Sequence, residues 1–235
     1  MNILAIDTAT DVMGVALTKD GHLKGELLTN LQKNHSVRLM PSIHHVMEEV
    51  EMVPGDLTKI IVSKGPGSYT GVRIGLSTAK AMAWALEIPI VGVSSLEVLA
   101  YQGRHSNMLI SPFIDARREA VFTGLYQFKE GEITSIVDDQ YIKMTDWLDY
   151  LSEQKRRIMF VSPNISMYER TIQDTLNEFA YIDKSIYQLG RPSDLITLGK
   201  NKERDEIHIL TPKYLRLAEA EANWLKQNKG RNTYG

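Results

Sequence analysis

The sequence contains no cysteine among its 235 residues. Disulfide bonds, thiolate metal sites and a cysteine nucleophile are therefore excluded, and the composition suits a reducing compartment. The sequence also lacks an apolar run long enough to cross a membrane. The apolar run at residues 3–6 is followed by the charged residue Asp7, so it is too short to be typical of a signal peptide. These absences predict a soluble cytoplasmic protein with no membrane partner.

An excess of positive charge is missing as well. Lysine and arginine number 27 and aspartate and glutamate 29, so the formal net charge is −2. A protein that binds nucleic acid on its own usually carries a strongly basic field. Two basic clusters, at residues 155–157 and 200–204, are flanked by acids and are more typical of a solvated surface than of a phosphate-binding patch. We therefore expect any contact with RNA to be local or shared with a partner.

The spacing of apolar residues predicts an α/β protein. In the first half, short apolar or alternating runs predict strands at residues 2–7, 12–17, 23–29, 59–63 and 90–93. Apolar residues three and four positions apart predict helices at residues 35–51, 71–86 and 94–101.

The second half repeats this opening, which indicates two related lobes. Residues 108–115 and 120–128 read as strands, and a further strand begins near residue 131. Helices are expected at residues 144–154, 165–178 and 192–202, with one more strand at 158–162. We predict a first lobe at residues 1–102, a second lobe at 103–217, and a short helix with a frayed tail at 218–235. A cleft between such lobes is the expected ligand site.

The most informative segment is KGPGSYTGVRIG at residues 64–75, which connects a predicted strand to a predicted helix. Glycines at 65, 67 and 71 let the backbone approach a partner closely, and the helix start offers unpaired N–H groups to an anion. Neither the P-loop pattern nor the dinucleotide fingerprint matches. From these residues alone, a phosphate site and a tight strand-to-helix turn both remain open.

Four segments carry a resemblance to a known family. They are ILAIDTAT at residues 3–10, GPGSYTGVR at 65–73, IDARRE at 114–119 and PKYLR at 212–216. In this order, along nearly the whole chain, they resemble the bacterial TsaB (YeaZ-type) proteins. The resemblance implies a two-lobe actin-like fold of the ASKHA and ribonuclease H-like type, with a mixed sheet and a three-stranded meander in each lobe. It also implies a role in making N6-threonylcarbamoyladenosine at position 37 of tRNAs that read codons beginning with A.

The resemblance further implies the partners. In that family the protein is a dimerising, non-catalytic subunit that pairs with the catalytic subunit TsaD, while the ATPase TsaE joins the pair. A homodimer forms when TsaD is absent, and tRNA is reached through the complex. Threonylcarbamoyl adenylate comes from another enzyme.

The resemblance places the contact with TsaD on the helices at 35–51 and 71–86. The residues expected there combine adaptable apolar side chains with small residues that let backbones approach: Leu39, Met40, Ile43, Met47, Gly71, Ile74, Gly75, Thr78 and Met82. Aspartate at Ile43 or Ile74 is expected to abolish pairing. For each of these residues, burial in the protein's own core is the alternative.

Two enzymatic alternatives were considered, and the first is a metal-dependent protease. Related catalytic subunits carry a His-x-x-x-His metal pair, but Ser95 and Leu99 stand at the matching positions, and leucine cannot bind a metal. His44 and His45, followed by Glu48 and Glu49, make i,i+4 pairs that could mimic a ligand set on a helix, yet no third ligand for such a pair is evident. We therefore predict no catalytic residue and no metal bound by this chain.

The second alternative is a kinase-like enzyme of the same fold. Asp7 and Asp115 each end the first strand of a lobe, where kinases of this fold hold Mg²⁺ and phosphates. No glycine follows either residue to wrap a phosphate, so the capping of turns beneath the cleft is favoured. ATP or ADP could still be held where the subunits meet. The candidate nucleotide or anion contacts are Asp7, Thr8, Thr10, Gly65, Gly67, Arg73 and Asp115.

Overall fold

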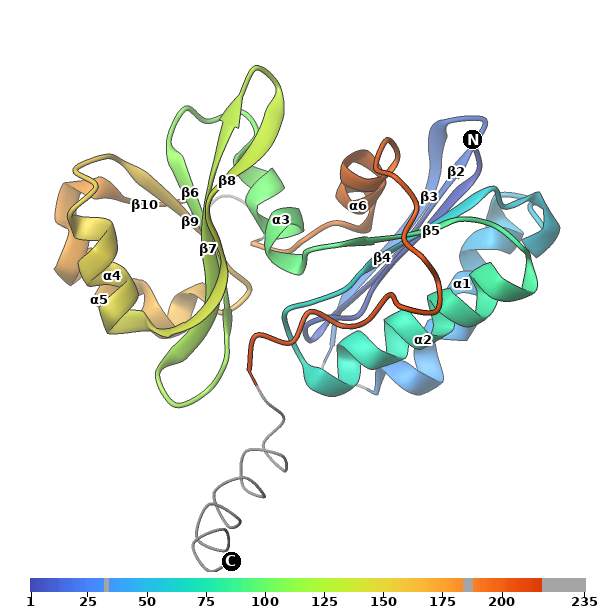
Figure 1. The fold of residues 1–235 in the computed structure, drawn as a ribbon, viewed down its shortest axis with the longest axis horizontal. Coiled ribbons are helices and arrows are strands. Elements are labelled where there is room, and N and C mark those ends of the chain that lie inside the picture. The colour runs from blue at the N-terminus through green and yellow to red at the C-terminus, as the bar shows by residue number, and fades with distance from the viewer. Residues whose placement is uncertain (32–33, 184–187, 217–235) are drawn as a thin grey trace, which may run out of the picture.

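The structure is a computed structural model that describes residues 1–31, 34–183 and 188–216. Its strands form two five-stranded sheets (Figure 1). The first sheet has the order β3-β2-β1-β4-β5, with β1 (Ile3–Asp7), β2 (Val12–Lys19), β3 (His22–Asn30), β4 (Lys59–Ser63) and β5 (Ile90–Val93). The second has the order β10-β9-β6-β7-β8, with β6 (Leu109–Asp115), β7 (Ala120–Lys129), β8 (Glu132–Lys143), β9 (Ile158–Val161) and β10 (Ala180–Ile182). The predicted α/β class is confirmed.

The two sheets share one topology. In each, the first three strands form an antiparallel meander, and the fourth and fifth strands add in parallel beside the first. Parallel neighbours need a crossover connection, usually a helix. The crossovers are α1 (His35–Glu49) and α2 (Tyr69–Ala85) in the first lobe, and α4 (Met144–Ser152) and α5 (Ile165–Leu176) in the second. This repeat is the two-lobe arrangement that the resemblance implied.

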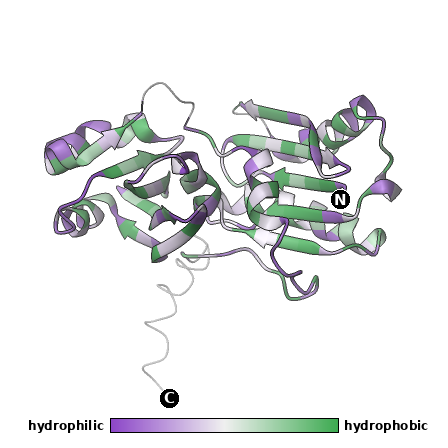
Figure 2. Ribbon diagram, turned by 90° about the horizontal axis from the view of Figure 1, so that it is seen from above, coloured by the Kyte–Doolittle hydropathy of each residue, from purple (hydrophilic) through white to green (hydrophobic). Residues whose placement is uncertain are grey.

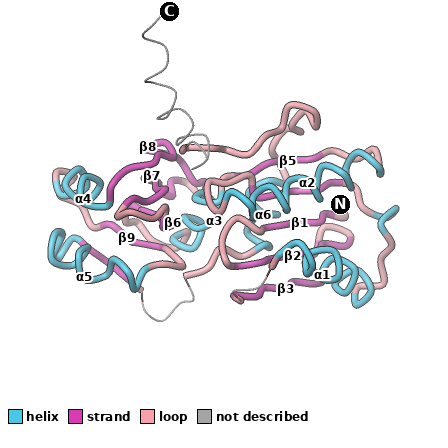
Figure 3. The backbone as a smooth tube through the Cα atoms, turned by 90° about the horizontal axis from the view of Figure 1, so that it is seen from below, coloured by secondary structure: helices cyan, strands magenta, loops and turns pink. Residues whose placement is uncertain are grey.

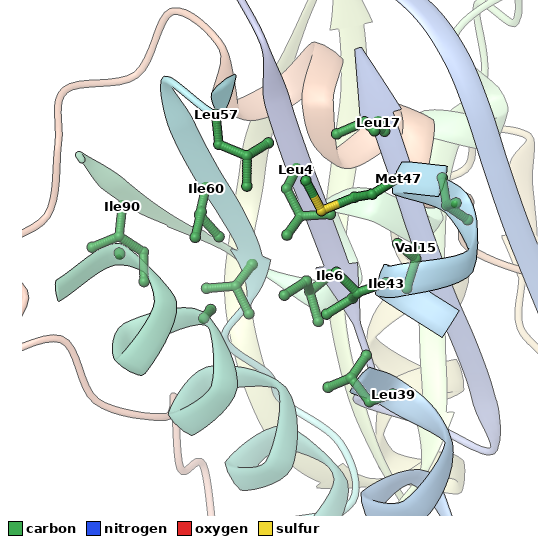
Figure 4. Close-up of a cluster of buried hydrophobic side chains, with 14 of the residues drawn as sticks. Leu4, Ile6, Val15, Leu17, Leu39, Ile43, Met47, Leu57, Ile60 and Ile90 are labelled. Carbon is green, nitrogen blue, oxygen red and sulfur yellow. The ribbon is translucent and has the colours of Figure 1, made fainter. Parts of the chain in front are cut away.

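Each sheet buries its outer face against its own pair of crossover helices. In the first lobe, Leu39 and Ile43 of α1 reach the strand residues Leu4 and Ile6 (Figure 4). In the second lobe, α4 inserts the fully buried Trp147. The strands are mainly green in the hydropathy view, whereas the outer helices alternate green and purple (Figure 2). Both pairs of helices are therefore amphipathic, and α4 and α5 lie at the opposite end of the molecule from α1 (Figure 3).

Two further helices, α3 (Ser95–Ala100) and α6 (Pro192–Gly199), lie between the sheets (Figure 1). The apolar side chains of α3 pack on both inner faces, and Leu96 contacts the second sheet. Leu195 of α6 packs on the first sheet, and the backbone approaches closely because a Cβ at Gly199 would lie 2.6 Å from Ile61. The inner faces of both sheets are thus covered as well.

The position of α6 corrects the predicted lobe boundaries. Residues 103–217 were assigned to the second lobe, but α6 packs on β1 and β2, and Leu210 joins the core of the first lobe. Residues 192–213 therefore return to the first lobe after the second sheet is complete. The predicted helix and tail at 218–235 lie outside the described residues. Among the residues that are described, no helix is long and apolar enough to span a bilayer, and the cytoplasmic location stays a prediction.

Candidate functional site

A cleft of about 610 Å³ lies between the lobes. It lies beyond the carboxyl ends of the central strands β1, β4 and β6, where open α/β sheets usually receive ligands. Its wall comes from the turns after these strands and from the C-terminal part of the described chain, at residues 9–11, 66–70, 114–117, 163–164 and 212–216. The cleft predicted from the two-lobe pattern is therefore present.

The glycine-rich loop forms one wall of this cleft and packs tightly on the turn after β1. A Cβ at Gly67 would lie 2.1 Å from the carbonyl oxygen of Ala9, far closer than real contacts allow. The Ser68 N–H donates to that same oxygen at 2.7 Å, and the Ser68 hydroxyl accepts from the Gly71 N–H at 3.2 Å. Both N–H groups already donate to acceptors within the protein, which favours the tight strand-to-helix turn over a phosphate-binding loop.

Gly67→Ala is expected to destabilise the protein by about 2–4 kcal/mol, because the added methyl group must displace backbone rather than a flexible side chain. Chemical denaturation followed by circular dichroism measures this change. Gly55→Ala is the matched control, since a Cβ there has no neighbour within 4 Å. Equal stability of the two variants would contradict the tight packing of the loop.

Asp7 caps the turn beneath the cleft. Its Oδ1 accepts from the Ala9 N–H at 3.0 Å, and the Ser63 side chain lies near enough to lower the pKa of the carboxyl group. Ser63 in turn shares a 2.6 Å hydrogen bond with Ser95. Burial raises the pKa of Asp7, although Ala9, Ser63 and nearby His35 oppose the rise. The residue is held by its own lobe, as the capping alternative expects.

Asp115 lies in the wall of the main cleft, apart from Asp7. Tyr168 donates to its Oδ1 at 2.8 Å, and burial together with this carboxylate raises the pKa of the Tyr168 hydroxyl. Asp7 instead lines an adjoining hollow of about 10 Å³, which has room for one water molecule at most. The structure therefore does not bring the two aspartates together in one cavity. Thr10 lines both hollows, while Thr8 is buried and donates to the Gly71 carbonyl oxygen at 2.7 Å.

Arg73 lies at the rim of the cleft and contacts two aromatic side chains. Its guanidinium carbon is 3.9 Å from the ring centroid of Tyr69, and its Nε donates to the Tyr214 hydroxyl at 2.6 Å. The two tyrosine rings stack with their centroids 5.2 Å apart. The sequence predicts Arg73 as an anion contact but predicts neither tyrosine, although each tyrosine lies in one of the segments that carry the resemblance.

Five of the residues predicted for a partner interface belong to the protein's own core, which corrects that prediction. The side chains of Leu39, Ile43 and Met47 are at most 3% exposed and face the first sheet (Figure 4). Gly71 and Gly75 abut the turn after β1, because a Cβ there would lie 2.2 and 2.4 Å from atoms of Thr8. An amphipathic helix buries its apolar stripe against the sheet of its own lobe, so the residues of that stripe are not exposed to a partner.

The outward side of the same two helices carries exposed apolar side chains among polar ones. Val37 and Met40 of α1 are 68% and 50% exposed, and Trp84 of α2 is 69% exposed. On α2, Ile74, Thr78 and Ala81 follow at spacings of three and four residues, so they share one side of the helix. We call the outward residues of these two helices the docking face, which comprises the exposed Val37, Met40, Ala81 and Trp84 and the half-buried Ile74, Thr78 and Met82.

Comparison with known proteins decides the family. Residues 29–224 match the family model described as TsaD, tRNA N6-adenosine threonylcarbamoyltransferase. The tRNA threonylcarbamoyladenosine biosynthesis protein TsaB of Bacillus subtilis (strain 168) is 49% identical over 229 residues, which cover 97% of this chain and 100% of that protein. The chain belongs to the TsaB family.

Further relatives agree with this membership. The TsaB protein of Escherichia coli (strain K12) is 35% identical over 135 residues, 57% of this chain and 58% of that protein. The solved structure described as YeaZ from Pseudomonas aeruginosa superposes with a TM-score of 0.74 at 25% identity, covering 91% of this chain and 99% of that chain. The predicted resemblance to TsaB (YeaZ-type) proteins is therefore confirmed along nearly the full length.

In this TsaB-family chain, Ser95 and Leu99 stand at the two positions that would match a histidine pair, and both contribute to internal packing. The Ser95 hydroxyl bonds to Ser63, and Leu99 is buried in the cluster on the inner face of the second sheet. His44 lies 4.0 Å from Glu48 on the exposed side of α1, as a solvated i,i+4 pair. Within residues 1–31, 34–183 and 188–216, no group of three or more histidine, aspartate or glutamate side chains is placed to hold a metal ion.

Proposed function

We propose that this chain acts in the formation of N6-threonylcarbamoyladenosine in tRNA as a non-catalytic subunit. The Bacillus subtilis relative, which aligns over its full length, is named as a biosynthesis protein for that modification. In the proposal, the docking face on α1 and α2 binds a TsaD-type catalytic subunit, and TsaE joins the pair. The observation that carries the docking role is the exposure of large apolar side chains, above all Met40 and Trp84, on two neighbouring helices.

The composition of the docking face supports a protein partner. Large exposed apolar side chains gathered on one surface are typical of interaction sites. Ala81, at the centre of the α2 side, is small enough to let a partner helix approach closely. A face of this kind can also pair with its own copy about a two-fold axis. This supports the proposed homodimer when TsaD is absent.

The candidate catalytic positions support a non-catalytic role. Ser95 and Leu99 provide no imidazole where the related catalytic subunits place their histidines. Asp7 is held by the Ala9 N–H and lies outside the main cleft, so it is not placed to hold Mg²⁺ beside Asp115.

The basic residues support contact with tRNA through the complex rather than through this chain alone. Lys202 bonds to both carboxylate oxygens of Glu97 at 2.8 Å, so part of the cluster at 200–204 is already paired. With a net charge of −2, the chain lacks the broad positive field of an independent RNA binder.

We place any ATP or ADP of the complex beside the docking face. A hollow of about 390 Å³ opens there, where α1 and α2 begin, and it is lined by His35, Ser68, Thr70 and Ile74 among others. Two helix N-termini favour an anion at such a place. The Asn34 side chain accepts the Ser36 N–H, so part of that terminus is already capped.

A second candidate function is threonylcarbamoyl transfer by this chain itself, which the match to the TsaD family model favours. The two functions predict different results in a reconstituted reaction with TsaE, ATP, threonylcarbamoyl adenylate and unmodified tRNA. We expect modified adenosine only when both this chain and TsaD are present. Modified adenosine formed without TsaD would contradict the non-catalytic role, and full product formation without this chain would contradict the requirement for it. Mass spectrometry of nucleosides from the digested tRNA measures the product.

A further inference from the structure

Residues 212–216 run along the mouth of the cleft and form a strap that contacts both lobes. On the side of the first lobe, the Lys213 N–H donates to the carbonyl oxygen of Lys64 at 2.7 Å, directly after β4. The next residue, Tyr214, stacks on Tyr69 and accepts from Arg73 of α2. The strap is therefore fixed to the loop and helix that build one wall of the cleft.

On the side of the second lobe, two cationic side chains of the strap are held. The ammonium group of Lys213 donates to Oδ2 of Asp139 on β8 at 2.8 Å. The Arg216 guanidinium donates to the carbonyl oxygen of Ala116 at 2.8 Å and lies 5.6 Å from the ring centroid of Tyr141. A five-residue segment thus contacts both lobes directly, in addition to the two places where the chain passes from one lobe to the other.

Asp139 is the centre of this connection. Its side chain is only 1% exposed, and besides Lys213 it accepts hydrogen bonds from two hydroxyl groups. Ser94, which begins α3 in the segment that joins the lobes, donates to Oδ2 at 2.5 Å, and Tyr126 of β7 donates to Oδ1. Burial, with the negative charge of Asp139, raises the pKa of Tyr126 and keeps its hydroxyl protonated as a donor.

The energetics favour keeping this cluster intact. A buried carboxylate that is left without its cation strongly destabilises the folded state. The protein interior solvates the remaining charge much less well than water does. Lys213 is the more accessible member, with 37% of its side chain exposed, and a hollow of about 240 Å³ adjoins the cluster. If the lobes separated on this side, the contact between Lys213 and Asp139 would have to break.

We propose that the strap and Asp139 form a latch that holds the two lobes at one angle and so sets the width of the cleft. The latch acts on the cleft and the lobe angle, and it involves none of the residues of the docking face. It therefore stands independently of the proposed partner.

The absence of native cysteine allows a direct test on the full-length chain. Cysteines introduced at Lys24 on β3 and at Asp149 on α4, both exposed, would carry one spin label in each lobe. Pulsed electron–electron double resonance then measures the distribution of distances between the two spin labels, and so between the lobes. We expect a single narrow population in the parent. Lys213→Met, which keeps the side-chain length but removes the charge, is expected to add a longer and broader population.

Asp139→Asn is expected to give the same additional population as Lys213→Met. If the asparagine variant fails to fold, the lysine variant decides alone, since its side chain is partly exposed. The matched control is Arg170→Met, which removes a 3.5 Å ion pair to Asp174 within α5 of the second lobe and is expected to leave the distribution unchanged. A parent-like distribution in folded Lys213→Met, or the same broadening in the control, would overturn the proposal.

Discussion

Replacing Met40 and Ala81 with aspartate in one chain is expected to weaken binding to TsaD by at least about 100-fold, which corresponds to about 2.8 kcal/mol. Both side chains are exposed on the docking face, so the folded chain can hydrate the new carboxylates. In the complex, the same carboxylates would be buried against an apolar partner without a counter-charge. The melting temperature should therefore stay near that of the parent. Titration calorimetry with purified TsaD measures the affinity.

The control for this variant changes exposed apolar residues elsewhere. Leu23→Asp with Met167→Asp alters side chains that are 49% and 62% exposed, one on β3 and one on α5 of the other lobe. This control is expected to bind TsaD as the parent does. Parent-like affinity of the Met40→Asp, Ala81→Asp variant would show that α1 and α2 are not the interface, and equal weakening by the control would show a non-specific effect of charge.

The second large effect concerns folding rather than binding. Ile43→Asp is expected to prevent stable folding, because Ile43 is 2% exposed and packs in the outer core of the first lobe. A buried carboxylate without a partner costs several kcal/mol, which is comparable with the total stability of about 5–15 kcal/mol of a typical domain. Thermal unfolding followed by circular dichroism is the measurement.

Ile43→Val provides the conservative comparison and is expected to cost about 0.5–1.5 kcal/mol. Together with Met40→Asp, these variants separate the inner from the outer side of one helix, since positions 40 and 43 differ by only three residues. Ile43→Asp with the melting temperature of the parent would contradict the inward orientation of this residue. It would also restore Ile43 as a candidate interface residue, as the sequence analysis first expected.

Much of the fold could be predicted from the sequence, because the signals are local. Alternating apolar residues gave the meanders of both lobes, and helical spacing gave α1 and α2 within two residues at each end. The strand β10 was missed, since its three residues follow a helical pattern almost directly. The helix at α6 was predicted, but its place on the first sheet was not. Apolar spacing shows which side of a helix is buried and does not show which sheet covers it.

The candidate site was predicted less completely, for related reasons. The glycine loop and the cleft were expected, because glycine spacing and a repeated lobe are visible in one sequence. The inward orientation of Gly71 and Gly75 depends on the turn at Thr8, more than sixty positions away, and only the folded chain shows it. Asp139 belongs to no motif, so its contact with Lys213 across 74 positions could not be predicted.

The measurement that tests the central claim most directly compares two variants in the reconstituted tRNA reaction. One variant is Met40→Asp with Ala81→Asp on the docking face, and the other is Asp115→Asn in the wall of the cleft. If the chain acts by docking TsaD, the first variant loses formation of modified adenosine while the second retains it. Loss with Asp115→Asn, together with retention by the docking-face variant, would contradict the account and assign the chemistry to the cleft of this chain.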